Sequence, residues 1–529
     1  MMPPDISLSK EVGQPTIENN NIYNVFTEEE KEHQRSLSYD SGLNSSIEDD
    51  NEEDKKSTLD EFIELLPPKS ESTEQKKKIK RIERSLIERL IIDIRAILST
   101  LLSLPILVIL VLFAIYHTTK SQILDLLYFR TKRPQDVFEN IIPDEVITKD
   151  ETYYAKKWGY ESERHEVITE DGYIIIMYRI YKKGSNPRVG KKPVLIGHGL
   201  FQCSGAFVLN EEKSLTFTLA DEGYDVWVGN NRAIAGYDHI SLSHQDPEYW
   251  NWGLKELGIF DFTAMIDHVR KCSGYSKVAY IGHSQGNAQA FIGLSLCPEI
   301  ADKLSCFVAL APAIFSGNLV DSYPLCLLIK LNDWLYSLLF GTASFLPIMT
   351  VIQAIMHPKL FCFLAYSVFS YLFTWWDSHW IRRRKIKYFQ FTPRPVSARL
   401  IADWIAGWGR KGVCLYVADR NHSNHKAPSK VPLIVFYGTA DYLVNGERFV
   451  KTFAGYENHG LPQSQLAKEK SNTEKTCLDN NNTTLFPTLD LVHVERIDGY
   501  EHMDTIWGHN NHETTYPILI KQLKRAKWE

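Results

Sequence analysis

The feature that most constrains the fold is a short apolar run that leads directly into a serine flanked by glycines. Val278–Ile281 forms the run, and Gly282-His283-Ser284-Gln285-Gly286 follows it. A helix-forming segment, Asn287–Leu296, comes next, so the predicted order is buried strand, sharp turn and helix. The two glycines let the chain turn sharply enough to expose the Ser284 hydroxyl above the strand end. Ser284 is therefore the candidate nucleophile of an α/β fold, and an ordinary surface serine is the alternative.

Further short apolar runs, each bounded by turn residues, have the length of buried strands. Runs that are apolar on both faces are typical of a parallel sheet covered by helices. The spacers are long enough for crossover helices, as in Ile259–Cys272. We therefore predict an α/β domain with a mostly parallel sheet, whose first part is residues 151–312 and whose second part lies within residues 396–529, together with the remainder of a cap insertion. The further runs are Pro193–Gly197, Tyr224–Gly229, Cys306–Ala311, Val431–Gly438 and His493–Asp498.

An acid and a base are expected on later strands, because in folds of this kind they follow the serine in the order aspartate, histidine. Asp441 lies in the turn that ends the strand Val431–Gly438, and His502 follows the last apolar run. Both would lie at the carboxyl edge of the sheet beside Ser284, which makes Ser284, Asp441 and His502 the candidate catalytic residues. Nearby competitors are Asp479, Asp498 and Asp504 for the acid, and His493, His509 and His512 for the base.

Two main-chain amides are candidates for stabilising negative charge on a reacting carbonyl oxygen. Gln285 begins the helix after the serine, and N–H groups in the first turn of a helix have no partner within the helix. Gly197-His198-Gly199-Leu200 follows an earlier strand where a second donor is expected, so Leu200 is the other candidate. The alternative for this loop is a plain glycine turn in which His198 only packs.

Charge is distributed unevenly along the 529 residues, whose formal net charge is -6. Residues 1–75 contain 19 Asp and Glu against 6 Lys and Arg, with few large apolar side chains. Such a segment buries too little apolar area to offset the entropy of ordering it, so we expect a disordered acidic tail. The net charge and the lack of a basic, aromatic-interleaved pattern argue against a nucleic-acid partner.

A membrane helix is expected after this tail, within residues 76–120. Ala96–Tyr116 is a run of 21 residues without a charge, and at about 1.5 Å per residue such a helix matches a hydrocarbon core of about 30 Å. Residues 76–95 carry 8 Lys and Arg, against 4 in residues 117–136. The positive-inside rule therefore predicts a single-pass type II protein with a cytosolic N-terminus. We expect the plasma membrane or endoplasmic reticulum as its location, and a linker over residues 121–150.

Other interpretations of this helix stay open. It could be a buried core helix, whereas a signal peptide would stand at the extreme N-terminus. Pro105 also allows a bent helix that inserts into one leaflet and leaves both ends in the cytosol, as on a lipid droplet. The sequons at Asn421, Asn481 and Asn482 would be glycosylated only if the chain crosses the membrane.

The cysteines give no sign of a metal site. All 8 follow residue 200, with no CxxC pair and no Cys/His cluster at zinc-finger spacing. We therefore expect no metal and no cofactor. The even count allows disulfides without requiring them.

Several short motifs follow one another along residues 150–510. They are Trp158-Gly159-Tyr160, His165–Tyr173, His198-Gly199-Leu200, Gly229-Asn230-Asn231-Arg232, Pro247-Glu248-Tyr249-Trp250, Gly282–Gly286, Gly438–Asp441 and His502–Trp507. In this order they resemble the acid lipase family of gastric and lysosomal lipases. The resemblance implies an α/β-hydrolase fold with Ser284, Asp441 and His502 as the catalytic triad and Leu200 and Gln285 as oxyanion donors.

The acidic tail and the anchor make the chain look like the membrane-anchored fungal steryl ester hydrolases of that family. This implies hydrolysis of hydrophobic neutral lipid esters, above all steryl esters, at a membrane or lipid-droplet surface. A triacylglycerol lipase, an acyltransferase and a catalytically silent membrane scaffold are the alternatives. One departure is Ala233–Tyr237, where the family usually continues Gly-Asn and reaches a serine. Because this loop lies near the site in relatives, acyl or alcohol preference could differ.

A long insertion separates the strand Cys306–Ala311 from the strand that carries Asp441. We expect residues 313–395 to form a cap or lid. Trp334–Met356 and Leu360–Trp376 contain no Asp, Glu, Lys or Arg, and the basic run Arg382–Lys385 follows. The segment is either the core of a soluble cap or an apolar face that docks on lipid, with the basic run on anionic headgroups. Two further membrane spans are a third interpretation.

Overall fold

An eight-stranded sheet, in the order β1-β2-β4-β3-β5-β6-β7-β8, organises the chain. The structure is a computed structural model that describes residues 84–127, 145–186, 190–408, 412, 429–453, 456 and 486–528. The predicted tail over residues 1–75 and the sequons lie outside these residues. The strands are β1 (Tyr160–Ile168), β2 (Ile174–Lys182), β3 (Pro193–Gly197), β4 (Asp225–Gly229), β5 (Val278–His283), β6 (Leu304–Leu310), β7 (Val431–Gly438) and β8 (Leu489–Ile497).

Strand pairing confirms the predicted α/β fold with a mostly parallel sheet. Neighbouring strands from β4 to β8 in the sheet order are all parallel. The sequence did not predict β1 and β2, which form an antiparallel edge in which β2 also pairs antiparallel with β4. Strand β1 reads Tyr-Glu-Ser-Glu-Arg-His-Glu-Val-Ile and is only partly buried, so it lacks the apolar run that marks the central strands.

Alternate residues of each central strand enter two different cores. Leu195 of β3 lies in one hydrophobic cluster, whereas Val194 and Ile196 lie in the other. This follows from the two-residue period of a strand, which sends successive side chains to opposite faces. Helices cover both faces. The first face contacts α7 (Phe262–Ser273), α8 (Gln285–Leu296), α14 (Ala398–Gly407) and α16 (Gly446–Val450); the second contacts α4 (Glu151–Lys157), α5 (Leu215–Asp221), α18 (Asp504–Trp507) and α19 (Thr515–Leu523).

The segment predicted as a cap lies between β6 and β7 and is helical. Its helices α10, α11 and α12 are 8, 8 and 16 residues long, shorter than the roughly 20 residues that a membrane crossing requires. Two further membrane spans are therefore not formed there. The helices are α9 (Leu325–Leu328), α10 (Asp333–Phe340), α11 (Ile348–Ile355), α12 (Pro358–Phe373) and α13 (Lys385–Tyr388).

Three residues of the basic run Arg382–Lys385 pair with acids of the protein. Arg384 is fully buried and pairs with Glu145, and Arg383 pairs with Glu211. These side chains tie the cap to the hydrolase domain, because buried charges need partners within the protein.

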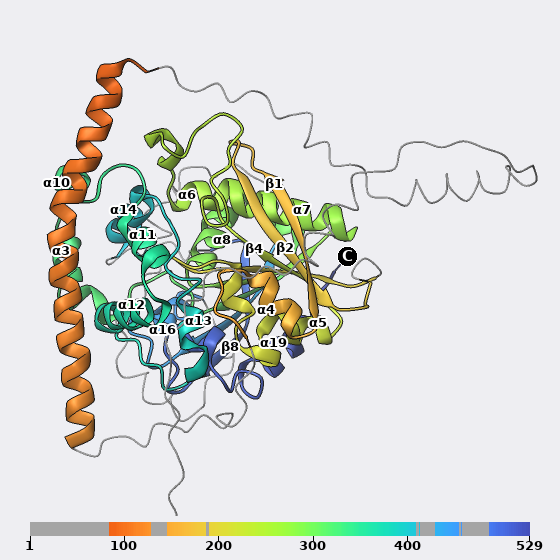
Figure 1. Ribbon diagram of the computed structural model, residues 1–529. Coiled ribbons are helices and arrows are strands. Elements are labelled where there is room, and N and C mark those ends of the chain that lie inside the picture. The colour runs from red at the N-terminus through yellow and green to blue at the C-terminus, as the bar shows by residue number, and fades with distance from the viewer. Residues whose placement is uncertain are drawn as a thin grey trace, which may run out of the picture. The chain divides into compact units, whose positions relative to one another are not determined.

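The predicted membrane segment lies within one long helix, α3 (Leu86–Leu127), which continues through Pro105. Among the described residues, its part Leu86–Ser121 is the one helix long and apolar enough to cross a membrane, and the mean hydropathy of its most apolar stretch of 18 residues is 2.7. The helix contacts α10 and α12 of the cap (Figure 1). Its buried positions are small or hydroxylated: Ser99, Ser103, Ala114 and Thr118. Such side chains let helices approach closely, as at helix contacts in membranes.

Candidate active site

Ser284 stands at the tip of a sharp turn between β5 and α8. Its backbone has φ 52°, in the left-handed region that side-chain-bearing residues rarely adopt. The turn depends on its two glycines. A Cβ on Gly286 would lie 2.6 Å from the Gly197 carbonyl oxygen, and one on Gly282 would lie 2.3 Å from Asn287 Oδ1. The predicted strand, glycine turn and helix are thus found together.

The structure brings the three candidate catalytic residues into one hydrogen-bonded chain. His502 Nε2 lies 2.8 Å from Ser284 Oγ, and His502 Nδ1 lies 2.9 Å from Asp441 Oδ2. Because a carboxylate only accepts, Nδ1 carries the proton and Nε2 is left to accept from the serine hydroxyl. Asp441 Oδ1 accepts from the main-chain N–H groups of Leu443 and Val444, at 2.9 and 3.0 Å, which fix the carboxylate.

The competing acids and bases have other partners. Asp504 bonds His379 and Trp380, and Asp498 is 81% exposed beside Arg496. His493 lies beside Glu495, whereas His509 bonds the carbonyl of His379 and His512 contacts Lys213. Asp479 lies outside the described residues. None of the described competitors therefore lies in the chain that joins Ser284 to Asp441.

A second set of buried groups supports the catalytic loops. His283 Nδ1 lies 3.1 Å from Gln202 Oε1, and its Nε2 lies 3.2 Å from the carbonyl oxygen of His502. Gln202 Oε1 also accepts from the Gly199 N–H at 2.9 Å. Burial lowers the pKa of His283 well below its ordinary value, so this imidazole is neutral and donates its single N–H to one of these two oxygens while packing against the other. It joins the loop after β3 to the loop of His502.

The two predicted oxyanion donors flank Ser284. Gln285 follows it directly at the N-terminus of α8, and its side-chain oxygen accepts from Trp404 Nε1 at 3.1 Å. Leu200, on the loop after β3, lines the same cavity as Ser284. Their positions are consistent with the prediction, and their role as donors remains a prediction.

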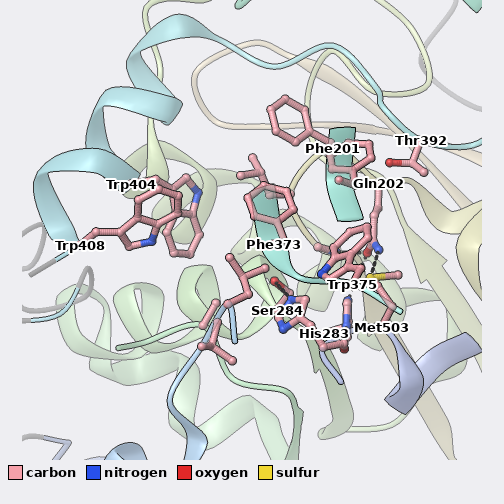
Figure 2. Close-up of a pocket in the computed structure, with 17 residues that line it drawn as sticks. Phe201, Gln202, His283, Ser284, Phe373, Trp375, Thr392, Trp404, Trp408 and Met503 are labelled. Atoms are coloured by element: carbon pink, nitrogen blue, oxygen red, sulfur yellow. Dashed lines mark hydrogen bonds between the residues drawn. The ribbon is translucent and has the colours of Figure 1, made fainter. Parts of the chain in front are cut away.

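A cavity lined mainly by apolar and aromatic side chains opens beside Ser284. Figure 2 shows Ser284 beneath Phe373 and Trp375, with Trp404 and Trp408 to one side. The Trp375 ring stacks near the His502 ring, with centroids 6.5 Å apart and planes 14° apart. Phe373 and Trp375 belong to the cap over residues 313–395, and Trp404 and Trp408 belong to the rest of the insertion between β6 and β7, so this insertion supplies this side of the cavity. The site therefore suits an apolar substrate.

The loop Ala233–Tyr237, which was expected to influence the acyl or alcohol preference, does not line this cavity. Ile234, Ala235, Gly236 and Tyr237 line a separate cavity, and none of them is among the residues around Ser284. The loop therefore makes no direct contact with the cavity at Ser284, although it was expected to lie near the site.

Sequence analysis missed a pair of buried carboxyl groups beside the candidate base. Glu501 and Asp504 are 3% and 0% exposed, and burial raises the pKa of both. Glu501 accepts from the Trp376 N–H at 2.6 Å, whereas Asp504 Oδ2 lies 3.0 Å from His379 Nδ1. The sequence signal was the acid-rich Glu501-His502-Met503-Asp504, but only the fold brings the cap segment that contains Trp376 and His379 to it.

The comparisons with known proteins agree with this geometry. A model of the partial α/β-hydrolase lipase region matches residues 152–211, and a model of the α/β-hydrolase fold matches residues 192–331. Sterol esterase 2 of Saccharomyces cerevisiae is 29% identical over 436 residues, covering 74% of this chain and 75% of that protein. A probable lipase of Schizosaccharomyces pombe is 30% identical over 396 residues, covering 70% and 79%.

The chain belongs to the acid lipase family of α/β-hydrolases. Gastric triacylglycerol lipase of Bos taurus, another relative, is 38% identical over 197 residues, covering 36% of this chain and 48% of that protein. This acid lipase family member is a carboxylic ester hydrolase of lipid esters. Among its described residues, the one group of His, Cys and acidic side chains close enough to share a metal ion lies away from Ser284, on β1 and α7.

Proposed function

We propose that the protein hydrolyses esters of hydrophobic neutral lipids, with steryl esters as the preferred substrates, through an acyl-enzyme on Ser284. The observation that carries the proposal is the hydrogen-bonded chain from Ser284 through His502 to Asp441 at an apolar cavity. A weak nucleophile such as serine needs an oriented base of this kind.

In the first step, His502 Nε2 accepts the Ser284 proton as Oγ attacks the ester carbonyl. Asp441 keeps the Nδ1 tautomer and stabilises the imidazolium that forms. His502 then donates its Nε2 proton to the leaving alcohol, which produces the acyl-enzyme. Water repeats the cycle with His502 as base and releases the fatty acid.

The negative charge that develops on the carbonyl oxygen needs fixed donors. We assign this role to the main-chain N–H groups of Gln285 and Leu200. Gln285 stands in the first turn of α8, where the helix dipole also favours negative charge. Trp404 holds the Gln285 side chain, which keeps this turn in place.

The apolar lining supports a neutral lipid as the substrate. Phe373, Trp375, Trp404 and Trp408 offer dispersion contacts and no charge to a polar headgroup. The likeness to sterol esterase 2 supports a steryl ester, and the likeness to a gastric triacylglycerol lipase makes triacylglycerol the second candidate.

Purified full-length protein in detergent tests this proposal with steryl oleate and triolein as substrates. We expect release of oleate from steryl oleate to exceed release from triolein and to vanish in Ser284→Ala. Ser295→Ala, on the same helix with its hydroxyl bonded to the Phe291 carbonyl, is the matched control. Unchanged turnover in Ser284→Ala would overturn the mechanism, whereas faster triolein hydrolysis would overturn the substrate preference alone.

The membrane face of the enzyme is proposed to include both α3 and the cap over residues 313–395. Large apolar side chains of the two remain exposed, whereas the small residues of α3 are buried. Exposed apolar surface of this extent is typical of a membrane contact. An ester dissolved in the membrane would then pass between cap helices into the cavity without entering water. The exposed large apolar residues of the cap are Tyr323, Leu327, Trp334, Val351, Ile355, Leu360, Phe363 and Trp376.

An ion pair bears on how α3 lies in the membrane. Arg84, directly before α3, lies 2.6 Å from Asp246 and also pairs with Glu248. Both acids belong to the segment between β4 and β5. A type II crossing would leave Arg84 in the cytosol and these acids outside, which would break the pair. The pair therefore favours the alternative in which α3 lies within one leaflet, as on a lipid droplet.

Glycosylation distinguishes the two arrangements. Lumenal exposure would place glycans on Asn421, Asn481 or Asn482, and endoglycosidase would then shift the mass of the wild type but not of a triple Asn→Gln variant. We expect no shift, and cytosolic protease access to tags at both termini. A glycosidase-sensitive band would instead support the type II prediction.

A further inference from the structure

Three metal-binding side chains from distant parts of the sequence meet where β1 lies against α7. His165 belongs to β1, and His268 and Cys272 belong to α7. One donor atom from each side chain lies within 4.8 Å of the others. His268 Nε2 is the centre of the group, 3.1 Å from His165 Nδ1 and 3.5 Å from Cys272 Sγ.

The two separations from His268 Nε2 are close to those between ligands of one zinc ion, and the third pair lies within 4.8 Å. With Zn–N distances of about 2.0–2.1 Å and a Zn–S distance of about 2.3 Å, tetrahedral geometry places two nitrogens about 3.3 Å apart and a nitrogen and a sulfur about 3.6 Å apart. His268 and Cys272 are four residues apart on one helix, so they share a face one turn apart. His268 Nε2 can share at most one proton with its two neighbours. A metal ion, in contrast, would accept a lone pair from each of the three atoms.

The surroundings hold the two imidazoles in place. The buried Trp227 ring contacts both, with centroids 4.6 Å from His165 and 5.7 Å from His268. Glu163 Oε1 lies 3.4 Å from His165 Nε2, the nitrogen that faces away from the group. A carboxylate in this position is the usual support of a metal-bound histidine, because it orients the ring and increases its basicity.

We propose that His165 Nδ1, His268 Nε2 and Cys272 Sγ bind one zinc ion that fastens the edge strand β1 to α7. Two imidazoles and a thiolate suit zinc, whereas calcium and magnesium prefer oxygen ligands. The fourth ligand is water, since all three side chains are only partly buried. Binding releases the thiol proton of Cys272 to solvent.

The ion has a structural role in this position. Strand β1 is the edge of the sheet, and β2, β4 and β3 separate it from β5, which carries Ser284. No metal was expected because the cysteines lack zinc-finger spacing. The missed signal is His268-x-x-x-Cys272 on a helix, and nothing in the sequence links His165 to this pair.

Metal titration of the full-length protein in detergent tests the site. After treatment with chelator, the protein is titrated with Zn²⁺ and, separately, with Co²⁺. We expect one ion per chain, a rise in Tm with Zn²⁺, and a thiolate-to-cobalt charge-transfer band. Cys272→Ser should abolish that band, and His268→Gln should weaken zinc binding on the order of 100-fold or more.

Cys297→Ser is the matched control, because Cys297 is another partly buried cysteine and ends the helix α8. It should bind zinc as the wild type does. Labelling of Ser284 by a fluorophosphonate reports that each variant is folded. The proposal is overturned if folded, chelator-treated wild type binds no stoichiometric zinc, or if Cys272→Ser and His268→Gln bind it as tightly as wild type.

Discussion

The Glu501 carboxyl group accepts a hydrogen bond of 2.6 Å from the main-chain N–H of Trp376. Glu501 directly precedes His502, and Trp376 directly follows Trp375. The rings of His502 and Trp375 stack beside Ser284. One hydrogen bond therefore couples the wall of the cavity, which belongs to the cap, to the loop of the candidate base. Burial is the main cause that raises the pKa of Glu501, and the neighbouring Asp504 raises it further. The Glu501 carboxyl group is therefore neutral in the folded protein.

The raised pKa of Glu501 predicts a pH-dependent stability. Its ordinary value is 4.5, so the unfolded chain loses this proton as pH rises above that value while the folded chain keeps it. The contribution to stability is complete below pH 4.5 and is lost as pH rises toward the folded-state pKa, by at most about 1.4 kcal/mol per pH unit. In Glu501→Gln, which mimics the neutral form, Tm should decline less between pH 5 and pH 8. Glu513→Gln, at an exposed carboxylate, should follow the wild type; parallel curves for all three would contradict the prediction.

Asp441 should matter for turnover far more than for binding. Asp441→Asn leaves the shape intact but allows the side-chain amide to favour the wrong His502 tautomer, so kcat should fall by about 10⁴-fold with little change in KM. A short, soluble p-nitrophenyl ester measures this without a membrane. Asp498→Asn, at the competing and exposed carboxylate, should keep full activity. A small effect of Asp441→Asn combined with a large effect of Asp498→Asn would reverse the assignment.

The sequence predicted the elements that place the catalytic candidates, because each central strand is a dense apolar run with a turn at its end. Strands β3 and β7 were predicted with their observed bounds, and β5 extends two residues beyond the predicted strand Val278–Ile281. Asp441 and His502 could be chosen among several acids and bases because they stand at strand ends on the edge that also carries Ser284.

What the sequence could not predict depends on contacts between distant segments. The polar edge strand β1 has no apolar run, and its stability depends on pairing with β2 over its whole length. The basic run Arg382–Lys385 has the composition of a lipid contact, yet Arg384 is buried against Glu145. Composition gives the charge of a segment but not which surface of the folded chain it meets.

Gly286 should tolerate no side chain. A Cβ there would lie 2.6 Å from the Gly197 carbonyl and 3.1 Å from the His198 carbonyl, both of them backbone atoms that cannot rotate away. Gly286→Ala should therefore push α8 from β3, lower stability by about 1–3 kcal/mol and reduce fluorophosphonate labelling of Ser284. Thermal unfolding and labelling rates measure both effects. Gly236→Ala is the control, since its nearest atom would be 3.7 Å away, and equal behaviour of the two variants would refute the steric argument.

The contact between α3 and the cap should matter only for substrates that reside in a membrane. Ser99 is 9% exposed, its hydroxyl donates to the Leu339 carbonyl at 3.2 Å, and Gly341 of the cap approaches it closely. Ser99→Phe has no room in this contact and should separate α3 from α10. Hydrolysis of steryl oleate in vesicles should then fall at least about 10-fold, the equivalent of about 1.4 kcal/mol, while the soluble ester is cleaved as before.

Ile109→Phe is the matched substitution, because Ile109 is 55% exposed on the same helix. It adds the same ring on a side of α3 that the cap does not cover, so both substrates should be cleaved at the wild-type rate. If Ser99→Phe lowers hydrolysis of the soluble ester as strongly as that of the vesicle substrate, α3 supports the fold of the cap and not the transfer of lipid. If neither rate changes, the cap receives its substrate without α3.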